Sequence, residues 1–415
     1  MAVAGIRRRS KPYRASLYKQ LPHPFCLLMD RIYLDHAATT PLDPAVFDAM
    51  EPYLRTHFGN ASSVHQLGRQ ARVAIEEARQ RIADALNAEP SEIVFTSGGT
   101  EADNLALKGA REARAAEGRT GLITSSAEHE AVLRPAERMT EQGAPVTILS
   151  PDAYGAVSPE QVAAAIDDTT ALVSLMHANN EIGVLTDIPA IADVCQAHDV
   201  WLHCDAVQTA GLFDLDVSTL GVDLLSVSGH KIYGPKGIGA LYVRGGIDLP
   251  PLVEGGSQER RRRGGTENVA AIIGFAEALT RAVRAADARR EHLATLQRRL
   301  IDGLDAAIDG PYVCNTPLDD APVAPHIVNV SFPPVDDTPL DGEMLILNLD
   351  MQGMMVSSGS ACTSGALAPS HVLSALGLSR ETASAAVRAS LGTSTTAADI
   401  DRFLEALHTT LQRMR

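Results

Sequence analysis

The chain has few cysteines, few aromatic residues and no long apolar run. Five cysteines in 415 residues do not make a disulfide framework, so a reducing cytoplasm is the expected compartment. No stretch reaches the roughly 18 apolar residues that a membrane-spanning helix needs, and we expect no membrane contact. Acidic residues outnumber basic ones by 51 to 36, and the net charge of −15 argues against direct nucleic-acid binding.

The sequence does contain enough apolar material for a large core, since 45% of its residues are hydrophobic. Short apolar segments alternate with helix-periodic segments from residue 73 to about 245. This pattern predicts an α/β fold with a mainly parallel sheet covered by helices on both faces. The seven expected strands are 93–95, 121–124, 146–149, 171–176, 200–203, 224–227 and 240–243.

A different pattern follows the expected sheet. A long helical stretch from about 267 to 307 leads to a strand at 327–332 and a helix at 341–348. A further strand at 386–390 and a helix from 397 to about 413 end the chain. We therefore predict a smaller C-terminal α+β domain.

Metal ligands at suitable spacing are rare. Cys195, His198, His203 and Cys204 are the one cluster with such a spacing. His203 and Cys204 are adjacent on an expected strand and should point to opposite faces. We expect no metal site.

The most informative segment is the turn 228–231 (Ser-Gly-His-Lys), which follows an expected buried strand. It places Lys231 at the end of that strand, with the Ser228 hydroxyl and the His230 imidazole beside it. A lysine in this setting can bind pyridoxal phosphate (PLP) as a Schiff base, while its neighbours take the phosphate. Taken alone, Lys231 also fits an ordinary surface lysine in a loop.

Two upstream elements strengthen the PLP interpretation. Asp205 ends an apolar segment, where a carboxylate can keep the pyridine nitrogen of PLP protonated, and Gln208 can donate to the ring 3-oxygen. A helix-capping aspartate is the alternative for Asp205. Gly99 and Thr100 lie in a Gly-rich turn before a helix whose N–H groups suit a phosphate. An ordinary tight turn would look similar.

Six segments carry a more specific signal, and they occur in a recognisable order. They are 33–41 (YLDHAATTP), 59–65 (GNASSVH), 97–101 (SGGTE), 179–183 (NNEIG), 228–231 (SGHK) and 357–364 (SSGSACTS). From about residue 32 onward the chain resembles the cysteine desulfurases of the iron–sulfur assembly and nitrogenase-type group, within the class-V aminotransferase family. Two departures are small: Gly99 stands where alanine is common, and Cys204 precedes the key aspartate.

The resemblance implies a fold-type I PLP-dependent transferase and roles for further residues. His129 is similar to the histidine that stacks on the PLP ring and moves protons. Asn180 is similar to the residue that contacts cofactor and substrate. Arg388, on an expected apolar strand, would bind the substrate carboxylate, although a structural salt bridge is an open alternative. Thr266 belongs to a phosphate segment that reaches the partner's cofactor in a homodimer. We expect the preceding arginines 260–263 to form a solvated loop.

Cys362 is the second chemical centre. It lies among small and polar residues, which predicts a mobile loop rather than a buried structural cysteine. A thiol there can visit the cofactor as thiolate, take sulfur and deliver it to an acceptor. The other cysteines, Cys26, Cys195, Cys204 and Cys314, have apolar or strand-like settings and are interpreted as structural.

The implied reaction is the conversion of L-cysteine to L-alanine, with a persulfide on Cys362 whose sulfur passes to an acceptor protein. That acceptor can be an iron–sulfur scaffold, a thiolation relay or a DNA-sulfur-modification system. Two rivals are a class-V aminotransferase or PLP lyase, such as selenocysteine lyase, that forms no persulfide, and a scaffold that has lost the chemistry. The Cys362 loop argues against the first, and the intact site residues against the second.

The expected organisation has three parts. Residues 1–28 form a basic extension with six basic and no acidic residues. A transit peptide and an arm for an acidic partner are possible, and a mis-assigned start is favoured because residue 29 begins the family pattern. We expect 29–265 to be the large PLP-binding domain, whose N-terminal segment packs on the small domain. The connecting helix and the small domain with the Cys362 loop would occupy 266–415.

Overall fold

The large sheet of the protein has seven strands in the described part of the chain. The computed structural model describes residues 31–358 and 369–415. The strand order is β2-β8-β7-β6-β5-β3-β4, and β8 alone runs antiparallel to its neighbours. The strands are β2 (Ile93–Thr96), β3 (Gly121–Ser125), β4 (Val146–Leu149), β5 (Thr170–Met176), β6 (Trp201–Asp205), β7 (Leu224–Ser228) and β8 (Gly239–Val243).

Most of these strands are short apolar runs that are buried on both faces, whereas β4 is partly exposed. Strands β2, β3, β5, β7 and β8 are buried at every residue, as expected for a sheet with helices on both sides. Strand β6 runs two residues further than the sequence indicated, so Asp205 is the last strand residue. The predicted α/β fold with a mainly parallel sheet is confirmed.

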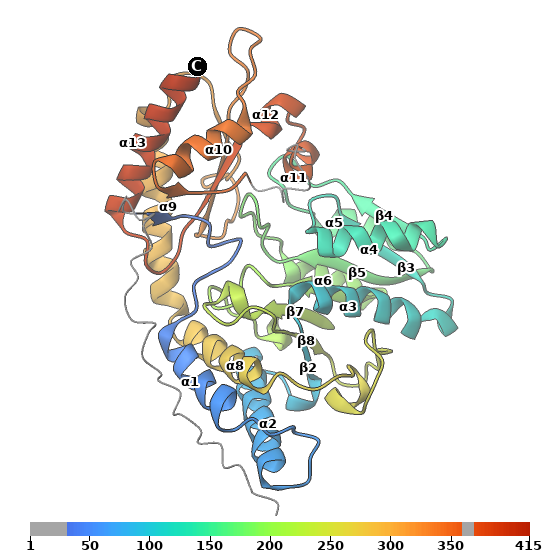
Figure 1. The fold of residues 1–415 in the computed structure, drawn as a ribbon. Coiled ribbons are helices and arrows are strands. Elements are labelled where there is room, and N and C mark those ends of the chain that lie inside the picture. The colour runs from blue at the N-terminus through green and yellow to red at the C-terminus, as the bar shows by residue number, and fades with distance from the viewer. Residues whose placement is uncertain (1–30, 359–368) are drawn as a thin grey trace, which may run out of the picture.

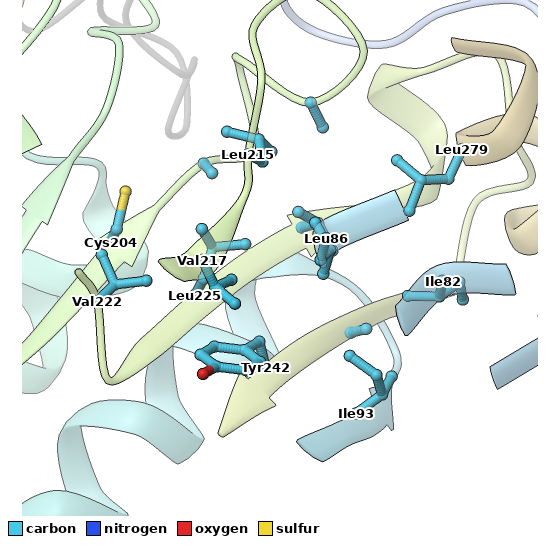
Figure 2. Close-up of a cluster of buried hydrophobic side chains, with 14 of the residues drawn as sticks. Ile82, Leu86, Ile93, Cys204, Leu215, Val217, Val222, Leu225, Tyr242 and Leu279 are labelled. Atoms are coloured by element: carbon cyan, nitrogen blue, oxygen red, sulfur yellow. The ribbon is translucent and has the colours of Figure 1, made fainter. Parts of the chain in front are cut away.

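Helices cover both faces of this sheet (Figure 1). On one face α1 (Pro44–Arg55), α2 (Gln66–Leu86), α6 (Ile188–Ala197) and α8 (Val269–Arg284) contribute to a core with α5 (Pro159–Ala165) and α7 (Val217–Leu220). Figure 2 shows Ile82, Leu225 and Tyr242 in this core. On the other face α3 (Gly99–Ala113) and α4 (Glu130–Glu141) form a separate apolar cluster.

A smaller sheet with its own core lies toward the C-terminus. Strands β9 (Val313–Cys314), β10 (Ile327–Ser331) and β12 (Ala386–Ser390) pair antiparallel in the order β12-β10-β9. The N-terminal β1 (Ile32–Tyr33) pairs with β11 (Met354–Met355). The helices of this part are α9 (Ala286–Ala307), α10 (Gly342–Met351), α11 (His371–Ala375), α12 (Arg380–Ser384) and α13 (Ala397–Met414).

The helical stretch expected at 267–307 is two helices, not one. Helix α8 ends at Arg284, Ala285 has φ −99° and ψ 4°, and α9 begins at the next residue. The buried side chains of α8 belong to the core of the large sheet, whereas those of α9 belong to the second core. One straight helix cannot face both cores, so the chain turns between them.

Four 3₁₀ turns complete the described secondary structure: η1 (Pro90–Glu92), η2 (Ala115–Glu117), η3 (Gly229–Lys231) and η4 (Gln258–Arg261). Within residues 31–358 and 369–415, no helix is long and apolar enough to cross a membrane. The same residues include no group of three or more His, Cys, Asp or Glu side chains placed to hold a metal ion.

Candidate active site

A cavity of about 430 Å³ opens at the carboxyl ends of β5, β6 and β7. This is the edge at which α/β sheets bind ligands, because the loops there are free to carry functional groups. Its walls also include the first residues of α3 and His129, the N-cap residue of α4. The sequence-predicted residues that line it are Gly99, Thr100, His129, Asn180, Asp205, Gln208, Ser228, His230, Lys231 and Arg388.

Two predicted residues remain, Thr266 and Cys362. Thr266 is exposed and does not line the cavity of its own chain. Cys362 lies outside the described residues. Ser357, five positions before Cys362, does line the cavity, and its backbone is bridged to that of Arg388. Ser357 is therefore the described cavity residue nearest in sequence to Cys362.

Lys231 ends the 3₁₀ turn η3, which follows β7 directly. Its amine donates hydrogen bonds to the carbonyls of Ala37 (2.5 Å) and Ala38 (2.9 Å). Burial and the positive charge of Arg388 lower the pKa of Lys231 to about 8, against the opposing effects of nearby carboxylates. About a tenth of this amine is thus neutral, and nucleophilic, at pH 7, far more than for an ordinary lysine.

Asp205 faces the same cavity from the end of β6. It does not cap a helix: its Oδ1 accepts a hydrogen bond from the backbone N–H of Val207 at 2.9 Å, within a turn. Burial raises the pKa of Asp205, whereas the Val207 N–H, His129 and Lys231 lower it. A buried carboxylate of this kind favours a positively charged partner, such as a protonated ring nitrogen.

The start of α3 forms a part of the cavity wall that suits an anion. Gly98 has φ 151°, and a side chain on Gly99 would come within 2.8 Å of the Val207 side chain. Both glycines are therefore needed to bring backbone N–H groups to the cavity, where the helix start favours negative charge. The Ser228 hydroxyl is buried there with no hydrogen-bond partner in the described structure.

His129 is both a helix-start residue and a cavity residue. It caps α4 by accepting a hydrogen bond at Nδ1 from the Ala131 N–H at 3.1 Å. This bond leaves the proton of the neutral ring on Nε2. Burial and Lys231 lower the pKa of His129, although Asp205 raises it, so the ring is predominantly neutral at pH 7.

Arg388 makes the salt bridge that the sequence left as an alternative to substrate binding. Its guanidinium donates to Asp35 at 2.9 Å and to the Asn180 carbonyl at 2.8 Å. It also lines the cavity, and its Nε is buried with no hydrogen-bond partner in the described structure. Sequence reasoning missed Asp35 as this partner, although a cation on an apolar strand implies a nearby acid.

Sequence reasoning also missed two buried carboxyl groups. Asp103 lines the cavity from α3, and Glu128 accepts a hydrogen bond from the Met176 N–H at 2.9 Å. Burial raises the pKa of both well above the usual range, and the charge of Asp205 adds to this. Asp103 lies one helical turn before Leu107 on the buried face of α3, and that spacing was the available signal.

The described cysteines are poor candidates for sulfur chemistry. Cys204 lies among the buried side chains of the core of the large sheet (Figure 2). It is not among the residues that line the cavity. Burial raises the pKa of Cys195 to about 12 and that of Cys204 well above its usual range. Neither forms the thiolate that attack on sulfur requires.

The residues of the cavity fit PLP. The α3 start and the unpartnered Ser228 hydroxyl suit its phosphate, Asp205 suits its ring nitrogen, and the Lys231 amine suits its aldehyde. The cavity is large enough for a ligand of this size.

Comparison with known proteins agrees with this geometry. The family model for aminotransferase class-V matches residues 32–403. The chain belongs to this family. The family predicted from the sequence motifs is therefore confirmed.

Similar members of the family have informative names. "Cysteine desulfurase IscS" of Dictyoglomus turgidum is 45% identical over 384 residues, covering 92% of this chain and 95% of that protein. A solved "NifS-like protein" has a TM-score of 0.84 and 35% identity, covering 92% of this chain and 100% of the other. A structure described as "SspA in complex with cysteine" has a TM-score of 0.75 and 38% identity, covering 86% of this chain and 98% of the other.

Proposed function

We propose that this protein is a PLP-dependent cysteine desulfurase that converts L-cysteine to L-alanine and carries the released sulfur as a persulfide on Cys362. The observation that carries the proposal is the single cavity that brings together Lys231, Asp205 and the α3 anion site. A relative that is 45% identical over 384 residues is named cysteine desulfurase, and this name supports L-cysteine as the substrate. A lyase or aminotransferase without persulfide transfer is not favoured.

Each cavity residue has a proposed task. Lys231 binds PLP covalently, Asp205 holds the ring nitrogen, and Gln208 contacts the ring oxygen. Bound PLP supplies an electron sink for bond breaking next to the amino-acid nitrogen. The phosphate would be held by the α3 start and its neighbours; the proposed phosphate residues are Gly99, Thr100, Ser228, His230 and, from a partner subunit, Thr266.

Arg388 and Asn180 are the proposed substrate residues. The guanidinium of Arg388 is buried, faces the cavity and retains one unpaired N–H, so it can bind the carboxylate of L-cysteine. Lys231 and His129 are the proposed proton carriers. Because both have lowered pKa values, each can accept a proton near neutral pH.

Cys362 is proposed to attack the substrate sulfur. Ser357 lines the cavity, and five extended residues span roughly 17 Å, so Cys362 is within reach of bound substrate. The thiolate forms an S–S bond as the C–S bond of the substrate breaks. The electron pair left on carbon takes up a proton and gives alanine. The persulfide then passes to a sulfur acceptor protein, proposed to be an iron–sulfur scaffold or a thiolation relay.

We also propose a homodimer that works in the cytoplasm. The exposure of Thr266 supports a phosphate contact supplied in trans, because this residue lies outside its own cavity. Exposed apolar side chains near α1 and α2 supply a surface for the second subunit; among them are Phe47, Leu54, Phe58 and Val64. The described cysteines are all free, which fits a reducing compartment.

The deciding experiment compares Cys362→Ser with Cys314→Ser. The serine hydroxyl is a far weaker nucleophile toward sulfur than a thiolate, so Cys362→Ser should bind PLP and L-cysteine but release almost no alanine. Cys314 lies in β9, its thiol donates to the Thr316 carbonyl, and it does not line the cavity, so Cys314→Ser should keep the activity. Normal alanine release by Cys362→Ser would rule out the persulfide step.

A further inference from the structure

The segment before Thr266 is held by a buried ion pair that the proposed chemistry does not use. Arg79 of α2 and Glu259 of η4 are separated by 180 residues, and their side chains are 4% and 3% exposed. The two N–H···O distances are 2.8 and 2.9 Å, which makes the contact bidentate. An ion pair this deeply buried needs a reason, because desolvation offsets much of its attraction.

Both partners of this pair also bind strand β2. Glu259 accepts a further hydrogen bond from the Phe95 N–H at 2.9 Å, and Arg79 donates to the Ile93 carbonyl at 2.8 Å. The guanidinium lies over the Phe95 ring, 4.6 Å from its centroid. The pair therefore fixes η4 to the strand that leads into the Gly-rich turn at Thr100.

The backbone around Glu259 is strained. Glu259, Arg260 and Arg261 have φ values of 44°, 55° and 69°, in the left-handed region that L-residues other than glycine rarely adopt. Such a conformation persists only where the surroundings impose it. The expectation of a simple solvated loop here is thus incomplete, since Arg260 and Arg262 donate to the carbonyls of Pro90 and Ser91 at 3.0 and 3.1 Å.

After the strained turn, residues 263–266 form an arm that contacts with other segments hold in place. Arg263 pairs with Glu101 of α3 at 2.9 Å. The Gly264 N–H donates to the Val253 carbonyl at 2.7 Å, and a side chain on Gly264 would come within 2.7 Å of the Gly255 backbone. Thr266 follows these contacts at the end of the arm and is exposed. Its direction is therefore set by the turn at Glu259.

We propose that the buried Arg79–Glu259 pair is a positioning device that aims Thr266 at the cofactor phosphate of the partner subunit. This proposal rests on the homodimer of the proposed function. An apolar pair could fill the same space, but only a bidentate ion pair anchored to β2 sets the orientation of a strained turn. Each subunit thereby determines how tightly its partner holds PLP, without a contact between the pair and the cofactor.

The test uses mixed dimers in which one subunit carries Lys231→Ala and therefore cannot bind PLP covalently. Glu259→Gln is placed either on that subunit or on the other one. When both changes lie on one chain, the other subunit has the intact Lys231 but receives Thr266 from an arm that is no longer held in place. The PLP affinity of that subunit should fall by about ten- to hundredfold, the loss expected for one hydrogen bond to a charged group. When the changes lie on separate chains, the subunit with the intact Lys231 receives Thr266 from an unchanged arm, and its PLP affinity should stay normal.

Two controls separate positioning from folding. Glu254→Gln removes an exposed carboxylate from the same arm and should change PLP affinity in neither arrangement. The double variant Arg79→Met with Glu259→Met replaces the pair by apolar side chains, so the fold should persist while PLP affinity still falls. Normal PLP affinity in this folded double variant would overturn the proposal.

The remaining outcomes are also decisive. Equal affinity in the two mixed dimers, or a loss only when Glu259→Gln lies on the chain with the intact lysine, would overturn the proposal. A protein that is monomeric in analytical ultracentrifugation would also overturn the proposal. A PLP-loaded dimer that releases no alanine from L-cysteine would instead refute the proposed function and leave the PLP-affinity result standing.

Discussion

The lowered pKa of Lys231 predicts how PLP loading depends on pH. The amine must be neutral to attack the aldehyde of PLP. With the pKa lowered from 10.5 to about 8, roughly 9% of the amine is neutral at pH 7, compared with about 0.03% for an ordinary lysine. At equal intrinsic reactivity the apo-protein should therefore capture PLP about 300-fold faster than a lysine peptide at pH 7.

The sign of the pH effect follows from the same value. Because the pKa of Lys231 is lowered to about 8, most of the amine becomes neutral as the pH rises through about 8. Above that pH the rate of PLP loading should become constant. The rate for a lysine peptide should keep rising until about pH 10.5. The assay is the stopped-flow absorbance of lysine-bound PLP after mixing apo-protein with limiting PLP from pH 6 to 10.

Arg388 provides the test of the physical cause. After burial, its positive charge is the main effect that lowers the pKa of Lys231. Arg388→Met removes this charge and leaves Asp35 without its partner, and both changes raise the pKa. The inflection should move to higher pH, whereas Arg388→Lys should keep it near the wild-type position. An unchanged profile in Arg388→Met, or a wild-type rate that still rises at pH 10, would refute the reasoning.

Three further predictions concern single side chains. Lys231→Ala should abolish covalent PLP, so a near-ultraviolet pyridoxyl absorbance that stays on the protein after borohydride reduction and denaturation would contradict its role. Ser228→Ala should weaken PLP binding by about tenfold in equilibrium titration, because a hydrogen bond to a charged phosphate is lost; unchanged affinity would place the phosphate elsewhere. Gly392→Ala should destabilise the fold by about 1–3 kcal/mol, since the added methyl comes within 2.1 Å of the His36 ring; an unchanged Tm would show that this ring moves freely.

The sequence by itself determined the main sheet and the chemical identity of much of the cavity. All seven strands occur near the predicted positions because each reads as a short apolar run, and five of them are buried at every residue. Lys231, Asp205 and Thr100 were predictable for a related reason. Each ends such a run or lies three or four residues after it, and the carboxyl ends of parallel strands meet at one edge.

Only the tertiary structure decided which distant residues meet. Arg388 and Asp35 are 353 residues apart, and Arg79 and Glu259 are 180 apart, so no local pattern links them. The break at Ala285 likewise depends on two cores that form from different parts of the chain. Local propensity acts between neighbours in sequence, whereas ion pairs and helix ends depend on what the completed fold brings into contact.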